Sequence, residues 1–255
     1  MLSLFAISFL FSLTAFCQGG SIYPFQINEE LLSGLNIPQL ELKAHPEREY
    51  FQRRIYKGEE LSVYILSSET ALNEINDFPI DEFVYYLNGR ADIATKKGEL
   101  LQFWAGDYLF VPKGFSGSWT NNGGPKYHLE LSVISNQRAD STQLSTAQKP
   151  FLLDRSLLSG LGLTQVDSTH YRDLIYDGVE LEIWTESEET NTKEILSYPR
   201  EEFIHVLNGK LTLTTENSVT IEFVQGDFFI LPQGFRGTWK AEGQNLLRLL
   251  KVVSK

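Results

Sequence analysis

The sequence predicts an all-β protein built from two copies of one unit. Val, Ile, Phe, Tyr and Thr cluster in short runs between glycine-containing turns, and no amphipathic helical pattern persists beyond a few turns. DEFVYYLNG from Asp81 recurs as EEFIHVLNG from Glu201, and GDYLFVPKGFSGSW from Gly106 recurs as GDFFILPQGFRGTW from Gly226, both at an offset of 120 residues. Repeats of about 20 to 50 residues indicate solenoids. The offset of 120 residues found here is instead the size of a whole domain.

The composition is that of an ordinary globular protein. The chain has 255 residues, of which 42% are hydrophobic and 22% charged, so it can bury one large core or two small ones. Its formal net charge of −11 argues against a nucleic-acid partner, because binding phosphates requires a basic surface. A cationic or neutral ligand is electrostatically easier to bind.

The N-terminal run is predicted to be a secretory signal. Met1–Phe16 is uncharged and apolar, too short to span a bilayer comfortably, and small and polar residues follow it. We expect residues 1–17 to be removed ahead of Gln18 and the protein to be secreted or periplasmic, without a membrane span. Because no Lys or Arg precedes the apolar run, a buried first strand or helix is the alternative.

Cys17 is the only cysteine, which excludes an intrachain disulfide. A lipid-modified Cys17 would anchor the protein to a membrane, but Phe16 is bulky where such signals place a small residue, which argues against the anchor. We therefore expect stability to come from packing.

The two copies begin with a related segment and differ by one insertion. LLSGL occurs at Leu31 and again at Leu157, at an offset of 126 residues instead of 120, so the first copy carries six extra residues in a polar loop. Beyond that loop, Ile55–Val133 aligns with Ile175–Val253 without a gap. The chain is therefore interpreted as a duplication of one domain.

Each copy is predicted to consist of short strands joined by tight turns. Asn88-Gly89 and Asn208-Gly209 are typical hairpin turns, because Asn and Gly both accept a positive φ. Many short strands with such turns form a sandwich or a barrel. The strand-like runs of the first copy are at 54–58, 60–66, 82–89, 91–95, 106–114 and 128–134. The predicted divisions are a first domain at 21–135, a polar linker at 136–149 and a second domain at 150–255.

These motifs carry a family resemblance. In both copies the pattern E(x)6G is followed by GD(x)4PxGxxGxW, which resembles the two halves of the cupin signature. The closing GxW is similar to the cupin group of the ethanolamine-utilisation protein and the ureidoglycine aminohydrolases. The resemblance implies a bicupin, with two tandem jelly-roll (double-stranded β-helix) barrels in one chain. Since cupin barrels often pair by exchanging edge strands, it also implies a compact monomer that mimics a cupin dimer, with homodimerisation left open.

The resemblance further implies a divalent metal held in the barrel by two His, a Glu and a third His. In this sequence only the Glu positions, Glu82 and Glu202, hold a residue able to coordinate a metal. A single carboxylate does not make a site for Mn, Fe or Zn, which need roughly three or four N, O or S donors. We therefore predict no metal and no other cofactor. The remaining positions are Leu196, Tyr198 and Gly237 in the second copy and Asn76, Phe78 and Gly117 in the first.

The histidines do not supply the missing ligands. His45 lies in the inserted loop and His170 in its counterpart, while His128 lies in the last strand of the first copy. His205 follows Glu202 by three residues, so strand alternation places it on the opposite face. We interpret each as a surface or hydrogen-bonded histidine.

Glu82 and Glu202 are the first candidate site residues, since each lies in an otherwise apolar strand. If these side chains point inward, their desolvation must be relieved by a cation, a hydrogen bond or protonation. Glu202 is the predicted catalytic residue, as a general acid or base, and Glu82 is a predicted ligand anchor. The alternative is that each carboxylate accepts from backbone amides or pairs with a barrel Arg.

Five further side chains are predicted to line a ligand pocket. The two Trp residues end the repeated motif and either pack over the barrel end or stack on a sugar ring. In the alignment of the two copies, Arg236 corresponds to Ser116 and Arg248 to His128, so the residue types at these positions differ between the copies. The second copy has the more polar mouth, which favours it as the active one. The five predicted residues are Tyr198, Tyr85, Arg236, Trp239 and Trp119.

Three functions fit the sequence. The first is an exported, metal-free bicupin that binds a small polar metabolite or saccharide in a barrel pocket. The second is an enzyme, by resemblance an aminohydrolase-like hydrolase or a sugar-acid isomerase, that uses Glu202. The third is a structural or oligomerising protein whose barrels are filled.

Overall fold

The computed structural model describes residues 22–43, 45–123, 127–140, 143, 145, 147, 149–153, 156–243 and 246–255. The predicted signal at 1–17, with Cys17, and parts of the predicted linker lie outside the described residues. The described chain is almost entirely strand, with a short helix α1 (Glu29–Leu32) and a 3-10 turn η1 (Leu157–Ser159). Within these ranges, no helix is long and apolar enough to cross a membrane.

The first barrel is formed by two antiparallel sheets. The larger has the order β11-β8-β5-β10-β3-β2 and the smaller β4-β9-β6-β7. The strands of the larger sheet are β2 (Tyr50–Lys57), β3 (Leu61–Glu69), β5 (Glu82–Asn88), β8 (Tyr108–Val111), β10 (Tyr127–Ser135) and β11 (Phe151–Leu152). Those of the smaller sheet are β4 (Ala71–Ile75), β6 (Arg90–Thr95), β7 (Leu100–Trp104) and β9 (Gly117–Asn122).

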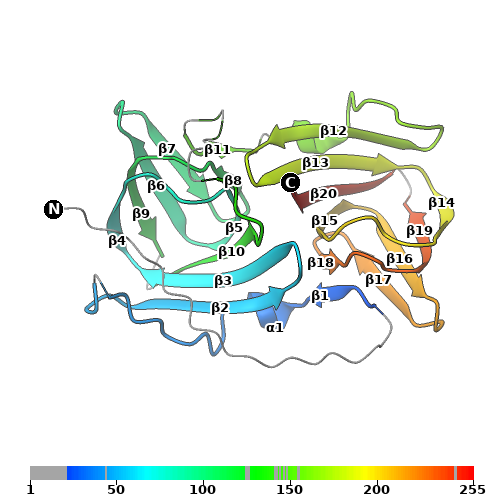
Figure 1. The fold of residues 1–255 in the computed structure, drawn as a ribbon, viewed down its shortest axis with the longest axis horizontal. Coiled ribbons are helices and arrows are strands. Elements are labelled where there is room, and N and C mark those ends of the chain that lie inside the picture. The colour runs from blue at the N-terminus through cyan, green and yellow to red at the C-terminus, as the bar shows by residue number, and fades with distance from the viewer. Residues whose placement is uncertain are drawn as a thin grey trace.

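The second barrel repeats this plan and stands beside the first (Figure 1). Its larger sheet has the order β1-β18-β15-β20-β13-β12 and its smaller β14-β19-β16-β17. The larger sheet contains β1 (Phe25–Ile27), β12 (His170–Asp177), β13 (Leu181–Glu188), β15 (Glu202–Asn208), β18 (Phe228–Leu231) and β20 (Leu247–Ser254). The smaller contains β14 (Asn191–Ile195), β16 (Lys210–Thr215), β17 (Thr220–Val224) and β19 (Gly237–Glu242). The prediction of two tandem jelly-roll barrels is confirmed.

The two barrels exchange their N-terminal strands. Strand β1, from the first copy, pairs with β18 of the second barrel, with Phe25 opposite Ile230. Strand β11, from the second copy, pairs with β8 of the first barrel, with Phe151 opposite Phe110. The strand exchange implied by the family resemblance therefore occurs within one chain.

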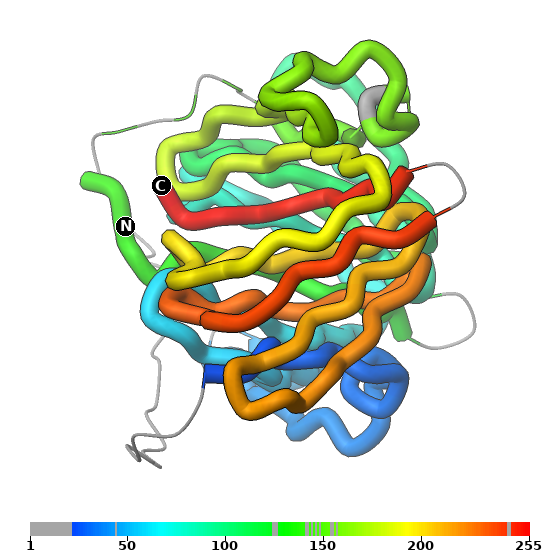
Figure 2. Tube along the Cα trace, turned by 90° about the vertical axis from the view of Figure 1, so that its right-hand side faces the viewer, coloured from blue at the N-terminus to red at the C-terminus, as the bar shows by residue number. Residues whose placement is uncertain are grey.

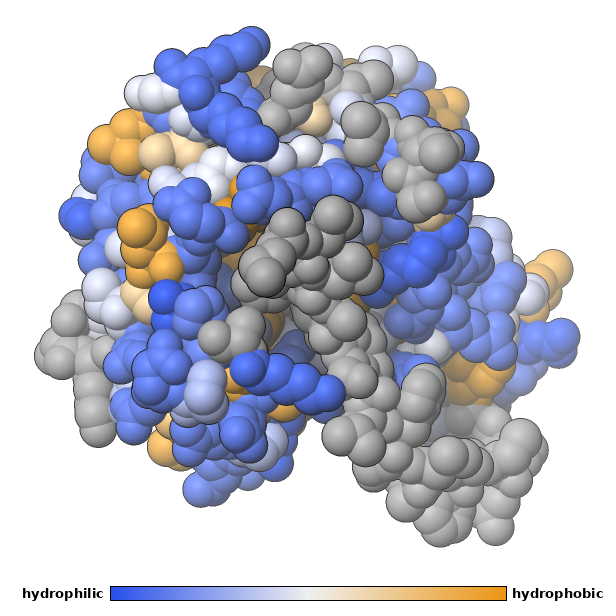
Figure 3. Space-filling model, turned by 60° about the vertical axis from the view of Figure 1, so that its left-hand side comes forward, coloured by the Kyte–Doolittle hydropathy of each residue, from blue (hydrophilic) through white to orange (hydrophobic). Residues whose placement is uncertain are grey.

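The larger sheets of the two barrels pack face to face around a shared apolar core. Phe83 on β5 and Phe203 on β15 are fully buried, and their ring centroids lie 5.7 Å apart. Each barrel has a separate interior cluster on the opposite face of these strands. Burying one such side chain stabilises the fold by about 1.5 to 3 kcal/mol, so the shared core stabilises the association of the two barrels. The outer face of the first barrel is mostly hydrophilic, with scattered apolar side chains (Figure 3).

An acidic residue from each copy caps a hairpin of the other barrel. Asp81 Oδ2 accepts hydrogen bonds from the backbone N–H groups of Val179 at 2.6 Å and Glu180 at 2.8 Å. In the reverse direction, Glu201 Oε1 accepts from the backbone N–H of Leu61 at 2.7 Å. A Cβ at Gly58 would lie 1.9 Å from Glu201 Oε2, so the cap requires glycine in that turn. These contacts tie the barrels together with charge-assisted hydrogen bonds.

The register of the last strand corrects the ungapped alignment of the copies. Strand β20 lies inside its sheet beside β13, with Lys251 opposite Trp184 (Figure 2). In the first barrel Ser132 is opposite Tyr64, the residue equivalent to Trp184. Lys251 therefore corresponds to Ser132 at an offset of 119 residues, because the connection before β20 is one residue shorter. The alignment of Arg248 with His128 was wrong, and the residue equivalent to Arg248 is Leu129.

Candidate functional site

Each barrel interior contains a carboxylate at the start of a central strand of its larger sheet. Glu82 is the first residue of β5 and Glu202 the first of β15. Alternate residues of a strand share a face, and Val84 and Ile204 belong to the interior clusters. The two carboxylates therefore face the barrel interiors, while Phe83 and Phe203 face the shared core.

In the second barrel the carboxylate of Glu202 is paired with a buried lysine. Lys251 Nζ lies 3.1 Å from Glu202 Oε2 and 2.7 Å from Glu186 Oε2. The hydroxyl of Tyr198 donates to Glu202 Oε2 at 2.6 Å and accepts from Lys251 Nζ at 3.3 Å. All four side chains are buried. Pairing and hydrogen bonding of this kind are what make burial of charges tolerable.

The electrostatics of this cluster hold Glu186, Lys251 and Tyr198 in fixed protonation states at neutral pH. Burial opposes ionisation of Glu186, but Lys251 and then His170 outweigh it and hold its pKa well below the ordinary value. Burial likewise opposes the charge on Lys251, but Glu186 and Glu202 outweigh it and raise the lysine pKa well above its usual range. Burial raises the pKa of Tyr198. None of these three groups is poised to exchange a proton near neutral pH.

Trp239 forms the wall of the same interior. It is only 2% exposed, and its indole N–H donates to Glu188 Oε2 at 2.6 Å. Glu188 is also paired with Lys193, whose ammonium lies 4.9 Å from the centre of the Trp239 rings. Tyr198 stacks on Trp239 with centroids 6.5 Å apart and planes 7° apart. Trp239 therefore packs inside the barrel and does not present an open face to solvent.

The residues of the second barrel do not fit the divalent metal that the family resemblance implies. Lys251 Nζ contacts both Glu202 and Tyr198, which occupy two of the expected ligand positions. Leu196, at a third, is 74% exposed. A Cβ at Gly237, the fourth, would lie 2.0 Å from the backbone oxygen of Thr214, so no side chain fits there. Among the described residues no group of three or more His, Cys, Asp or Glu side chains is arranged to hold a metal.

The first barrel has no equivalent lysine. Ser132 stands at the position of Lys251, and its hydroxyl donates a short hydrogen bond to Glu82 Oε1. Glu82 is half-buried, unlike the buried Glu202. Burial and then the negative charge of Glu130 raise the pKa of Glu82 to about 7. Its carboxyl group can therefore bind or release a proton near neutral pH.

A second carboxylate, Glu130, acts on Glu82, and a histidine lies beside Glu130. His128 Nδ1 lies 3.1 Å from the backbone nitrogen of Ser68 and 3.2 Å from its carbonyl oxygen. The other ring nitrogen, Nε2, is 3.5 Å from Glu130 Oε2, and neither of these two atoms has a hydrogen-bond partner among the described residues. The interior of this barrel thus holds two carboxylates with no lysine between them, whereas the carboxylates of the second barrel are paired with Lys251 and Lys193.

Trp119 takes the place of Trp239 in the first barrel. It is 7% exposed, and its indole N–H donates to Asn121 Oδ1 at 2.6 Å. The hydroxyl of Tyr86 donates to the same oxygen at 3.2 Å. Like Trp239, this residue forms an interior wall with a satisfied indole nitrogen.

Two predicted pocket residues lie outside the barrel interiors. The ring of Tyr85 packs between the barrels, 5.0 Å from Tyr108 and 5.2 Å from Phe228. His205 lies in the same layer, accepting or donating a hydrogen bond to the Tyr108 hydroxyl at 2.8 Å, and burial lowers its pKa to about 4. Arg236 is exposed on the loop before β19. The structure therefore brings together Glu202, Tyr198 and Trp239, but not Tyr85 or Arg236.

Comparisons with known proteins agree with the observed architecture. A sequence model of EutQ-like cupin domains matches residues 57–123 and 183–244, one segment in each barrel. No curated protein matches the chain.

Several solved structures are similar in fold. A cupin 2 conserved barrel domain protein from Leptotrichia buccalis is 13% identical with a TM-score of 0.55, over 81% of this chain and 89% of that one. Protein Ylba from E. coli is 13% identical with a TM-score of 0.52, over 88% of each chain. A mutant of the salicylate 1,2-dioxygenase from Pseudoaminobacter salicylatoxidans is 13% identical with a TM-score of 0.55, over 78% of this chain and 72% of that one. At such identities these similarities show the fold alone.

Proposed function

The chain belongs to the EutQ-like cupin family, and from this premise we propose that it is a metal-independent bicupin that binds a small polar ligand in its first barrel. One difference between the copies carries the proposal. Where the second barrel has the ammonium of Lys251 between two carboxylates, the first has the short hydroxyl of Ser132.

The carboxylates inside the second barrel are each paired with a lysine. Lys251 neutralises Glu186 and Glu202, and Lys193 pairs with Glu188. A polar ligand would have to displace an existing ion pair and leave its partner buried and unpaired, which is costly. This barrel is best suited to a structural role.

The first barrel offers unmet interactions. The half-buried Glu82 remains accessible to solvent, and Glu130 Oε2 has no hydrogen-bond partner among the described residues, its polar neighbour being His128 Nε2 at 3.5 Å. A buried acceptor left unsatisfied destabilises the protein by about 1 to 3 kcal/mol, and a ligand that donates to it recovers part of that loss. Hydroxyl or amine groups on a small metabolite or saccharide would supply such donors.

An enzymatic role is the second candidate, and one observation favours it. The pKa of Glu82 is raised to about 7, a value suited to general acid or base catalysis at neutral pH. The predicted catalytic residue, Glu202, is instead engaged by Lys251 and Tyr198. If the protein is a hydrolase or isomerase, we place the acid or base at Glu82.

Export completes the proposal. The apolar run Met1–Phe16 supports a signal peptide, and the absence of a disulfide partner for Cys17 does not oppose secretion. N-terminal sequencing of the mature protein from the native host tests this part. A mature chain beginning at Gln18 supports export, and an intact Met1 contradicts it.

The ligand site is tested by a thermal-shift screen of polar metabolites and saccharides in the presence of EDTA. We expect stabilising compounds to lose their effect on Glu82→Gln and to keep it on Glu202→Gln, which serves as the matched control. Hits that act equally on both variants, or that act only after a divalent metal is added, would contradict the proposal.

A further inference from the structure

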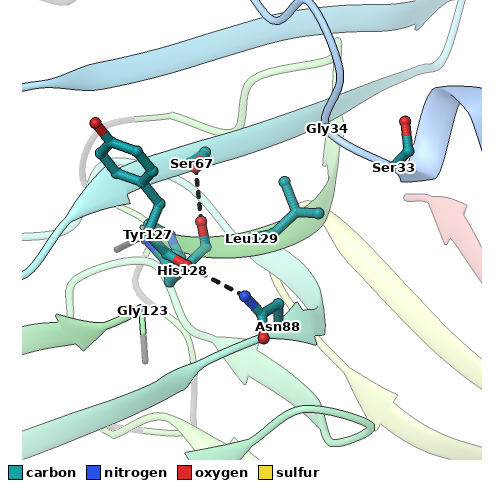
Figure 4. A pocket seen from close by; sticks show the side chains of 8 residues that line it. All are labelled: Ser33, Gly34, Ser67, Asn88, Gly123, Tyr127, His128 and Leu129. Carbon is teal, nitrogen blue, oxygen red and sulfur yellow. Dashed lines mark hydrogen bonds between the residues drawn. The ribbon is translucent and has the colours of Figure 1, made fainter. Parts of the chain in front are cut away.

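A surface pocket lies at the end of the first barrel opposite Glu82. It has a volume of about 290 Å³ and lies between the loop after α1 and strands β3 and β10 (Figure 4). Its rim includes Asn88, the last residue of β5, whereas Glu82 is the first, so the two sites are roughly 20 Å apart along the strand. The residues that line the pocket are Ser33, Gly34, Ser67, Asn88, Gly123, Tyr127, His128 and Leu129.

The second copy contains the same structural environment. Leu129 pairs with Ser67 and Asn88 in the first barrel. Arg248 pairs with the equivalent residues, Ser187 and Asn208, in the second. The two sites are therefore formed by equivalent strands of the two barrels, with Leu129 at the centre of one and Arg248 at the centre of the other.

The glycines that cover the two sites also correspond. Gly34 and Gly160 each follow the LLS of the repeated LLSGL motif and have φ values of 71° and 75°. A Cβ on Gly34 would lie 2.8 Å from Leu129 Cδ1, and one on Gly160 would lie 2.7 Å from Arg248 Cδ. The side chains of residues 129 and 248 thus run in the same direction, under equivalent glycines.

In the second copy, the side chain of Arg248 extends far enough for its guanidinium group to reach two backbone carbonyls. Arg248 Nη1 donates to the backbone oxygen of Leu158 at 3.3 Å and, through a short hydrogen bond, to that of Ser159. The equivalent carbonyls in the first copy belong to Leu32 and Ser33. Leu129 is shorter than arginine and has no donor, so it cannot make these bonds.

From this comparison we infer that the pocket binds a guanidinium group, which takes the place that the Arg248 side chain fills in the second copy. The hydroxyl of Tyr127, at the rim, donates to Glu49 at 2.6 Å, which places a carboxylate near the entrance. The chain carries a net charge of −11, which also favours a cation.

The ligand class follows from the shape of the surface. A second pocket of about 250 Å³ adjoins the first through Gly34, Ser67 and Tyr127, and extends to Ile37 and Phe51. An aliphatic chain attached to the guanidinium would lie along these apolar side chains. The ligand is therefore a small guanidino compound with an alkyl tail. This pocket and the site proposed at Glu82 have different centres, and they meet at His128, which lines the pocket and lies 3.5 Å from Glu130.

Agmatine is a suitable probe, and N-carbamoylputrescine, in which a neutral urea replaces the guanidinium, is its matched control. Titrations followed by amide NMR should shift the resonances of Gly34 and Leu129 in the wild type. Hydrogen bonds from a charged donor are stronger than those from a neutral one, so the control should bind about five- to tenfold more weakly. Amide dispersion in the same spectra verifies that each variant is folded.

Two reciprocal variants test the assignment. Leu129→Arg should fill its own pocket, as Arg248 does, and abolish agmatine binding, whereas Leu129→Met should retain it. Arg248→Leu should open a second site, so that two agmatine molecules bind per chain and Gly160 also shifts. Absence of binding to the wild type, binding unchanged by Leu129→Arg, or equal affinity for the neutral control would overturn the inference.

Discussion

Replacing Lys251 with methionine removes the ammonium between two buried carboxylates and leaves a side chain of similar length. Lys251 Nζ is 2.7 Å from Glu186 and 3.1 Å from Glu202, and all three side chains are buried. Breaking a buried pair leaves an uncompensated charge, which lowers the free energy of unfolding by about 3 to 5 kcal/mol. The similar size of methionine limits any contribution from a cavity.

Urea unfolding followed by circular dichroism measures this change, and Lys240→Met is the matched control. Lys240 Nζ lies 2.9 Å from Glu242, a distance similar to those around Lys251, but its side chain is 48% exposed. An exposed pair contributes about 0 to 1 kcal/mol. If Lys251→Met and Lys240→Met lower the free energy of unfolding by the same small amount, the argument that Lys251 is an essential internal cation is refuted.

The pH dependence gives a second readout of the same variant. The pKa of Glu186 in the folded protein is held below its ordinary value of 4.5 by Lys251, against the effect of burial. Its contribution to stability is therefore present above that ordinary value and is lost as the pH falls through the folded pKa. Lys251→Met should reduce this loss on acidification, whereas Lys240→Met should leave it unchanged.

The remaining predictions concern the first barrel, the caps and the glycine turns. Burial raises the pKa of Glu82 from its ordinary value of 4.5 to about 7, so between these pH values the native state binds more protons than the unfolded state. This group therefore makes the free energy of unfolding fall as the pH rises through that range. Glu82→Gln should remove this fall in urea titrations at several pH values. His205, whose pKa is lowered from 6.5 to about 4, acts in the opposite direction, and His205→Gln should remove a loss of stability between these values on acidification. Asp81→Ala leaves backbone N–H groups of the other barrel unpaired and should lower the free energy of unfolding by about 1 to 3 kcal/mol. The control Asp77→Asn, at an exposed position whose φ of 57° asparagine also accepts, should be nearly silent. Gly237→Ala should destabilise the fold by more than about 1 kcal/mol in the same assay, because its Cβ would lie 2.0 Å from the oxygen of Thr214. Equal unfolding curves for variant and wild type would refute each of these arguments.

The fold was predictable because its signals are local and occur twice. Gly89 and Gly209 do turn at positive φ, with values of 90° and 82°. The prediction that these Asn-Gly turns close hairpins was wrong, because each joins strands of different sheets, β5 to β6 and β15 to β16. Strand alternation correctly placed His205 on the face opposite Glu202. The family resemblance implied an exchange of edge strands, and the structure identifies them as the N-terminal strands β1 and β11.

The site was less predictable because it depends on contacts between distant strands. Lys251 joins Glu202 and Glu186 across three strands, and an alignment shifted by one residue on β20 pairs it with the wrong residue of the first copy. An alignment error of one residue exchanges the two faces of a strand. It therefore assigned Lys251 to the face of β20 that packs against the other barrel, instead of the face toward the barrel interior. Allowing a gap before the matching VIS and VVS segments that end at Ser135 and Ser254 would have revealed it.

The acidic pairs at 81–82 and 201–202 illustrate a second difficulty. Sequence reasoning singled out Glu82 and Glu202, but gave no role to Asp81 and Glu201, which cap hairpins in the opposite barrel. Neighbouring strand residues face opposite sides, yet what each side contacts depends on how the barrels pack. Tyr85 was misjudged for the same reason, since its face of β5 belongs to the interface between the barrels.

Elemental analysis of the natively purified protein tests most directly the claim that an internal ammonium replaces the metal of a cupin barrel. The geometry around Lys251 predicts far less than one equivalent of Mn, Fe, Ni or Zn per chain, before and after incubation with each metal. A near-stoichiometric transition metal that is retained through desalting would contradict the account.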